Sequence, residues 1–161
     1  MSCDEFCEKV RQYQNTMYAL AFSILRNDED AADAISESIM KAYSNLSHLQ
    51  SPRSFRAWLL KIVRNTCLEM LRKNPQAQAL EEEHEFADIS CHEDLSTKLV
   101  LREAVENLKQ PYRTVVYLFY YEDLPIMEIS KITGSSSFAV KKQLSRARAM
   151  LQKSLNKEDF F

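Results

Sequence analysis

Glycine is nearly absent from this chain, whose 161 residues include one glycine and four prolines. Sheet-rich folds need many tight turns and left-handed backbone conformations, and few residues here favour them. Alternating β-branched segments are also rare, whereas apolar residues recur at the three- and four-residue spacing of amphipathic helices. We therefore predict an all-α fold, and the length suits one domain or two small ones.

Long apolar runs and an apolar leader are missing as well. No segment reaches the roughly 20 apolar residues of a membrane-spanning helix, and the N-terminus is polar and acidic. We expect a cytoplasmic protein without membrane insertion of its own, whose four cysteines are reduced thiols. Their spacing matches no zinc module, so we expect no metal and no cofactor. Cys67 is predicted to lie in the core.

The charge is small overall but unevenly distributed. The formal net charge is −2, yet residues 1–73 carry ten Lys and Arg against nine acids. Residues 74–94 carry seven acids and no base, and residues 95–161 carry eleven bases against seven acids. Local patches rather than the mean charge determine binding to phosphates, so nucleic acid is not excluded. We predict two small helical domains, 1–73 and 95–161, joined by an acidic linker over 74–94.

Residues 1–73 contain three apolar stripes at helical spacing. The first ends near Leu25 and comprises Phe6, Val10, Tyr13, Met17, Leu20, Ala21 and Ile24. The second follows a cap at Asn27 or Asp28 and comprises Ala32, Ile35, Ile39, Ala42, Tyr43 and Leu46. The third, in a helix opened by Pro52, comprises Phe55, Leu59, Ile62, Thr66 and Met70. These stripes predict a three-helix unit.

The single glycine, Gly134, lies where a helix-turn-helix needs it. A left-handed residue costs an L-amino acid roughly 1–2 kcal/mol, which glycine avoids. Helices are predicted over 95–108, over 112–121 after Pro111, and on both sides of Gly134. The last helix carries no acid from Ser135 to Leu155, and its narrow apolar stripe comprises Val140, Leu144, Ala147 and Leu151. A basic second helix of this kind enters the major groove of DNA.

The helix predicted over 52–73 presents another basic face, with six bases and one acid. On a helical wheel this face gathers Arg53, Lys61, Arg64, Asn65 and Arg72, with Arg56 at its margin and Trp58 at its apolar boundary. It can be a solvated surface with Trp58 in the core. It also suits a DNA strand with unstacked bases, because each base stacked on an aromatic ring contributes roughly 1–3 kcal/mol. Two basic helices in two domains favour a chain that reads two DNA elements.

Short motifs in both domains resemble one known family. The first domain has AADAISE at 31–37, SFRAWL at 54–59, Arg64-Asn65 and Leu71-Arg72. The second has Arg113-Thr114-Val115, YEDL at 121–124, EIS at 128–130, Gly134, Val140-Lys141 and SRAR at 145–148. In order and spacing, over 10–73 and 97–155, they resemble regions 2 and 4 of the extracytoplasmic-function (ECF) sigma factors of the sigma-70 family. The resemblance implies an alternative subunit of bacterial RNA polymerase that opens the −10 element and reads the −35 element.

The same resemblance implies partners and site residues. Region 2 of the family holds the β′ clamp helices of core RNA polymerase, and the matching positions are Asp33, Ser36 and Glu37. Region 4 of the family lies on the β flap, and an anti-sigma factor commonly inhibits such proteins. For −10 DNA the candidates are Arg53, Arg56, Trp58, Lys61, Arg64, Asn65 and Arg72. For −35 DNA they are Ser136, Ser137, Phe138, Lys141, Lys142, Ser145, Arg146 and Arg148.

Several positions depart from the family pattern. Ser36 stands where glutamine is usual, Gln143 where arginine is common, and Phe138 where the residue is small. Thr133 and Ser135 replace an aliphatic pair around the glycine. We expect weaker packing at the turn and an altered −35 preference rather than loss of DNA binding. The acidic linker can imitate nucleic acid on the path of the RNA, or serve as a solvated tether.

Two other functions fit parts of the sequence. A free-standing helix-turn-helix regulator would use residues 1–73 for sensing or dimerisation and would not bind core polymerase. A helical metal- or redox-sensing module would use Cys3, Cys7, His84, Cys91 and His92. We do not expect an enzyme, because the sequence has no phosphate-cradling loop, no paired carboxylates in an apolar setting and no plausible triad.

Overall fold

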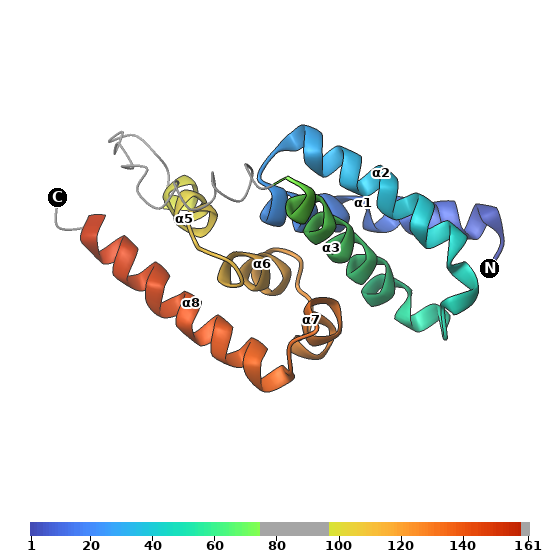
Figure 1. Ribbon diagram of the computed structural model, residues 1–161. Helices are drawn as coiled ribbons and strands as arrows, with labels where there is room; N and C mark the ends of the chain where they lie inside the picture. The colour runs from blue at the N-terminus through green and yellow to red at the C-terminus, as the bar shows by residue number, and fades with distance from the viewer. Residues whose placement is uncertain (75–96, 159–161) are drawn as a thin grey trace.

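The computed structural model describes residues 1–74 and 97–158, and within these ranges it has helices and no strand. The first unit comprises α1 (Cys3–Leu25), α2 (Asp28–Ser44) and α3 (Phe55–Lys73), with 3-10 turns at Leu46–His48 and Pro52–Ser54. The second comprises α5 (Thr97–Glu106), α6 (Tyr112–Val116), α7 (Ile126–Thr133) and α8 (Ser137–Glu158). The units lie side by side, with α7 against α3 (Figure 1). The all-α prediction is confirmed.

Side-chain caps fix the ends of the first two helices. Ser2 and Glu5 form a capping box at the start of α1, in which each side chain accepts a hydrogen bond from the other residue's backbone N–H, at 3.2 and 2.9 Å. Asn27 caps α2 by accepting a hydrogen bond from the Asp30 N–H at 2.9 Å. The predicted buried stripe of α1 is confirmed for Phe6, Val10, Met17, Leu20, Ala21 and Ile24.

The face that α2 buries differs from the predicted stripe. Ala32 and Tyr43 were expected inside and are exposed, and Ile35 and Ile39 are only half-buried. Of the predicted stripe, Ala42 is buried, and the other buried residues of α2 are Ala31, Ala34 and Ser38. Because α2 packs against both α1 and α3, small side chains along its centre allow the helices to approach closely. The two isoleucines therefore flank this contact rather than form it.

α3 is buried on more than one side. Its predicted residues Phe55, Leu59 and Thr66 are buried, whereas Ile62 and Met70 are half-buried. Further residues are fully buried because the second unit covers another side of the helix, namely Leu60, Val63 and Cys67. Burial confirms the core position of Cys67 and raises the pKa of its thiol to about 12.

The helix predicted over 112–121 has two parts. α6 follows Pro111 and continues into a π-helical segment, η4 (Tyr117–Tyr121). Leu118 of this segment is completely buried, while Tyr120 and Tyr121 remain about half exposed. α5 is described from Thr97, so the predicted start at Leu95 lies outside the described residues. The segment η4 therefore contributes Leu118 to the core and Tyr120 and Tyr121 to the surface.

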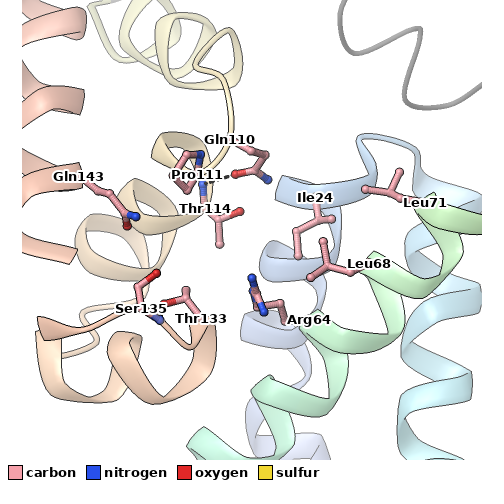
Figure 2. Close-up of a pocket in the computed structure, with 10 residues that line it drawn as sticks. All are labelled: Ile24, Arg64, Leu68, Leu71, Gln110, Pro111, Thr114, Thr133, Ser135 and Gln143. Carbon is pink, nitrogen blue, oxygen red and sulfur yellow. Dashed lines mark hydrogen bonds between the residues drawn. The ribbon is translucent and has the colours of Figure 1, made fainter. Parts of the chain in front are cut away.

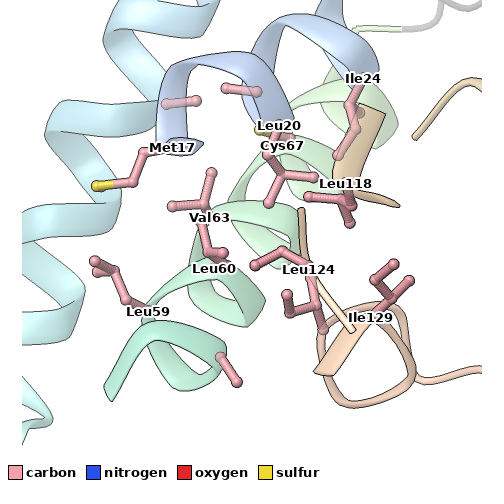
Figure 3. Close-up of a cluster of buried hydrophobic side chains, with 14 of the residues drawn as sticks. Met17, Leu20, Ile24, Leu59, Leu60, Val63, Cys67, Leu118, Leu124 and Ile129 are labelled. Atoms are coloured by element: carbon pink, nitrogen blue, oxygen red, sulfur yellow. The ribbon is translucent and has the colours of Figure 1, made fainter. Parts of the chain in front are cut away.

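One apolar core joins the two units. Figure 3 shows Leu118, Leu124 and Ile129 of the second unit next to side chains of α1 and α3, among them Leu20, Ile24, Leu60, Val63 and Cys67. These residues belong to a single cluster of buried side chains. The core therefore spans the junction between the units and does not end at it.

Polar groups border this core where α1 meets the start of α6. The Ser23 carbonyl accepts hydrogen bonds from Arg113 Nε at 2.6 Å and from Gln110 Nε2 at 2.8 Å. The hydroxyl oxygens of Ser23 and Thr114 lie 3.0 Å apart. Arg113 is only 3% exposed and also donates to the Leu108 carbonyl at 2.9 Å. Sequence reasoning missed this role, because arginine is almost never fully buried unless it is paired.

Candidate nucleic-acid interface

The turn between α7 and α8 has the geometry that its glycine allows. Gly134 has φ 76°, and its N–H donates to the Ser130 carbonyl at 2.9 Å. The Ser130 hydroxyl donates to the Ser135 carbonyl at 2.6 Å, and the Thr133 hydroxyl donates to the Ile129 carbonyl at 2.9 Å. The family usually has an aliphatic pair at positions 133 and 135. Here Thr133 and Ser135 take part in hydrogen bonds within the turn instead.

α8 separates an apolar face from a basic one. Val140, Leu144 and Ala147 are buried and Leu151 is half-buried, which confirms the predicted inner stripe. Ser136 precedes the helix, and its hydroxyl accepts a hydrogen bond from the Ala139 N–H at 3.1 Å. The Ser137 hydroxyl lies 3.3 Å from Met127 Sδ. The candidate −35 residues that stay exposed are Ser136, Phe138, Lys141, Lys142, Ser145, Arg146 and Arg148.

Phe138 stands out on this basic face because the residue is 76% exposed. It does not fold back against the turn, whose polar residues bond to one another instead. The ring occupies the first turn of α8, the part of a recognition helix that contacts base edges. An exposed phenyl ring there can touch the methyl group of a thymine in the major groove.

We expect Phe138→Ala to relax the sequence preference at one or two −35 positions by roughly 1–3 kcal/mol per position. Competition binding of the polymerase complex to promoters with single −35 substitutions measures this change. Because the ring is exposed, the melting temperature of the chain should stay unchanged. Met150→Ala is the matched control, since Met150 is an exposed apolar residue further along the same helix. Unaltered base preference together with earlier melting would show that the ring packs rather than reads DNA.

The basic face of α3 is only partly free. Lys61, Asn65 and Arg72 are exposed, as is Arg53 in the preceding turn. Trp58 is half-buried and packs against Phe55, with ring centroids 5.9 Å apart. The remaining candidates of this face, Arg56 and Arg64, are half-buried at the junction with the second unit.

Arg56 is engaged by the second unit. Its guanidinium binds the Glu128 carboxylate of α7 through both Nε and Nη2. Hydrogen bonding to Glu128 raises the pKa of Arg56. The contact is bidentate, which is also the geometry in which arginine binds a phosphate group. Thr16 and Glu122 form another side-chain contact between the units, at 2.8 Å. The residues of each pair lie far apart in the sequence, so no local sequence pattern could predict the contact.

The candidate polymerase-binding residues lie together on the outer side of α2. Asp33, Ser36 and Glu37 are all exposed. Glu37 pairs with Lys41 one turn further along, at 2.8 Å, and Lys41 also reaches Glu69 of α3 at 2.8 Å. Hydrogen bonds from Glu37 and Glu69 raise the pKa of Lys41. Asp33 makes no side-chain hydrogen bond or ion pair in the part of the chain that the structure describes, and its exposed carboxylate faces solvent.

Of the five residues proposed for a metal or redox site, the structure describes Cys3 and Cys7, whose thiols lie close enough to hydrogen-bond. Cys3 and Cys7 are exposed on α1, while Cys67 is buried apart from them. His84, Cys91 and His92 lie outside the described residues. Within residues 1–74 and 97–158, no group of three or more His, Cys, Asp or Glu side chains is placed to hold a metal ion. In the same ranges no helix is long and apolar enough to cross a membrane.

Two sigma-70 family models match this chain. Residues 10–76 match the family model for sigma-70 region 2, and residues 98–151 match the model for sigma-70 region 4. The RNA polymerase sigma factor SigV of Bacillus subtilis is 34% identical, over 93% of this chain and 90% of its own. The ECF RNA polymerase sigma factor SigW of the same organism is 30% identical, over 94% and 89%.

Solved structures share the fold at lower identity. The sigma factor RpoE of Bartonella quintana, in complex with the anti-sigma factor NepR, superposes with a TM-score of 0.74 at 22% identity, covering 94% of this chain and 97% of its own. CnrH, in complex with the cytosolic domain of CnrY, superposes with a TM-score of 0.71 at 20% identity, covering 97% and 90%.

Proposed function

The chain belongs to the extracytoplasmic-function sigma factors of the sigma-70 family, and we propose that its two helical units divide promoter recognition between them. As a member of this family it is an alternative sigma factor that directs RNA polymerase to promoters. The observation that carries the proposal is the match of both regions, in order, to units that each present an exposed basic helix face. A free-standing regulator would account for the second unit alone.

In the proposed division of labour, α8 reads the −35 element and α3 acts on the −10 element. The exposed basic residues of α8 supply phosphate contacts, and Phe138 supplies an apolar contact to a base edge. On α3, Lys61 and Arg72 hold the backbone of the strand, while Asn65 and Trp58 face unstacked bases. We assign 1–73 and 95–161 to these two tasks, with 74–94 as the acidic connection between them.

The two units have to separate when they bind promoter DNA. The −10 and −35 elements are centred about 25 base pairs apart, or roughly 85 Å along straight B-DNA. α3 and α8 contain 19 and 22 residues and so extend only about 30 Å each. α7, which leads into α8, contacts α3 directly. We therefore assign the packed arrangement to the free factor, in which Glu128 occupies Arg56 in place of a DNA phosphate.

Partners follow from the same assignment. The exposed acids of α2 fit the β′ clamp helices of core RNA polymerase, and the second unit fits the β flap. An anti-sigma factor is a further proposed partner, since the structurally similar RpoE and CnrH were solved with NepR and CnrY. The site of action is the cytoplasm, where polymerase and promoter DNA lie. We propose no catalytic step for the chain itself, because strand opening and RNA synthesis take place within the polymerase complex.

Run-off transcription tests the function directly. The chain, added to bacterial core polymerase, is expected to start transcription on a subset of promoters that vary at −35 and −10. If the chain forms no stable complex with core polymerase but still binds duplex DNA through its second unit, it acts as a free-standing regulator and the proposal fails.

Within that assay, Asn65→Ala is expected to reduce open-complex formation about tenfold while binding to closed duplex changes little. The Asn65 side chain is exposed, and its amide offers both a donor and an acceptor to a base edge. Permanganate footprinting of the −10 region measures opening, and gel shift at low temperature measures closed binding. Lys61→Ala is the control on the same helix face and should weaken binding to all promoters alike. If the Asn65→Ala variant opens the −10 region as well as the wild-type chain does, Asn65 has no role in strand opening.

A further inference from the structure

A cavity of about 200 Å³ lies at the junction of the two units. α1 and α3 form one wall, and the segment from Gln110 to the start of α8 forms the other (Figure 2). Much of its lining is apolar and comes from Ile24, Leu68, Leu71 and Pro111. Six polar side chains also line it, namely Arg64, Gln110, Thr114, Thr133, Ser135 and Gln143. Two of them, Arg64 and Gln143, come from opposite units and have unmet binding requirements.

Arg64 brings a charge without a counter-ion. Its guanidinium lines the cavity from α3 and is half-buried. It makes no ion pair or hydrogen bond with any residue in ranges 1–74 and 97–158, whereas Arg56, about two turns earlier on α3, binds Glu128 through two nitrogens. Burial without a partner lowers the pKa of Arg64. An unpaired charge removed from water is costly, so the cavity favours an anion beside this group.

Gln143 brings an acceptor without a donor. Its Oε1 atom is buried and receives no hydrogen bond, and it is the one side-chain atom of this kind among the described residues. Gln143 comes from α8, so it lies across the cavity from Arg64 (Figure 2). Buried polar atoms are nearly always hydrogen-bonded, so such an orphan indicates a missing donor. This observation is independent of the charge on Arg64.

We propose that the cavity binds a small organic acid that carries a hydroxyl group, with its carboxylate on Arg64 and its apolar body against Ile24, Leu68 and Pro111. Its hydroxyl donates to Gln143 Oε1, which is buried in the free chain and turns into the cavity when the ligand binds. A water molecule cannot neutralise Arg64. Inorganic phosphate can neutralise Arg64 but gains nothing from the apolar wall. Drug-sized ligands need roughly 300–1,000 Å³, so the ligand is smaller, of the size of a hydroxybenzoate.

Such a ligand would regulate the factor, and this step rests on the proposed function. Because the lining comes from both units, the ligand binds the packed arrangement and stabilises it by mass action. It also occupies Arg64, a candidate for contact with −10 DNA. A rise in the acid would therefore keep the free factor packed, and a fall would release it for promoter binding.

Isothermal titration calorimetry of the full chain tests the site without polymerase or DNA, so its outcome is separate from that of the transcription assay. The probes are para-hydroxybenzoate, benzoate, and para-hydroxybenzyl alcohol, which lacks the carboxylate. We expect para-hydroxybenzoate to bind at one site per chain, benzoate to bind more weakly, and the alcohol to bind at least about tenfold more weakly than para-hydroxybenzoate. The thermal midpoint should rise with the concentration of para-hydroxybenzoate.

Variants assign the contacts. Arg64→Met should weaken para-hydroxybenzoate at least about tenfold, whereas Lys61→Met, which removes an exposed charge from the same helix outside this cavity, should leave its affinity unchanged. Gln143→Leu should abolish the advantage of para-hydroxybenzoate over benzoate and leave benzoate binding intact, which also shows that this variant is folded. Absence of saturable binding to the wild-type chain overturns the proposal. Equal losses in the Arg64 and Lys61 variants would overturn it too, because they indicate binding to surface charge.

Discussion

Reversing both acids with Asp33→Lys and Glu37→Lys is expected to weaken assembly with core RNA polymerase by about ten- to a hundredfold. Both side chains are exposed on α2, one turn apart. Like charges brought together across an interface cost several kcal/mol, which is more than a surface ion pair contributes. Equilibrium titration of labelled core polymerase with the chain measures the change.

The fold should survive this reversal. The ion pair that Glu37 forms with Lys41 is exposed, so its loss costs at most about 1 kcal/mol. The double variant Glu8→Lys and Glu29→Lys is the matched control, since it makes the same change in net charge at exposed positions outside the proposed contact. Equal polymerase affinity of the two double variants would remove the assignment of α2 to the polymerase contact.

Leu118→Ala is expected to destabilise the chain by about 2–5 kcal/mol, the usual cost of truncating a fully buried leucine. In a chain of this length the thermal midpoint should fall by roughly 2–4 °C for each kcal/mol. Leu118 belongs to the second unit but lies in the core shared with α1 and α3 (Figure 3). The substitution should therefore destabilise both units together.

The single tryptophan makes this coupling measurable. Trp58 lies on α3 of the first unit, so its fluorescence follows the unfolding of that unit, while circular dichroism follows all helices. In Leu118→Ala both signals should show the same lowered midpoint. Leu101→Ala is the control, because Leu101 is a partly exposed leucine of α5. If Trp58 keeps its wild-type midpoint while helicity falls earlier, the units are energetically independent in spite of their shared core.

Local features of the sequence determined where the helices form and which faces of α8 are apolar and basic. The 3.6-residue period states which side of an isolated helix is apolar, and it correctly selected the stripes of α1 and α8. Capping is equally local, because Asn27 bonds to a group three residues away. The left-handed turn at Gly134 follows from that residue's own freedom. The exposed Asp33 and Phe138 lie where these periods put them.

Tertiary structure alone decided which apolar faces meet and which polar groups they enclose. α2 contacts two helices through alanines and a serine, although its isoleucines dominate the sequence pattern. Ser23 meets Thr114, and Arg56 meets Glu128, across 91 and 72 residues. The helical period shows which face of a helix is apolar. It cannot show which distant part of the chain packs against that face. The burial of Arg113, the isolation of Arg64 and the unpaired oxygen of Gln143 arise only when the two units pack together.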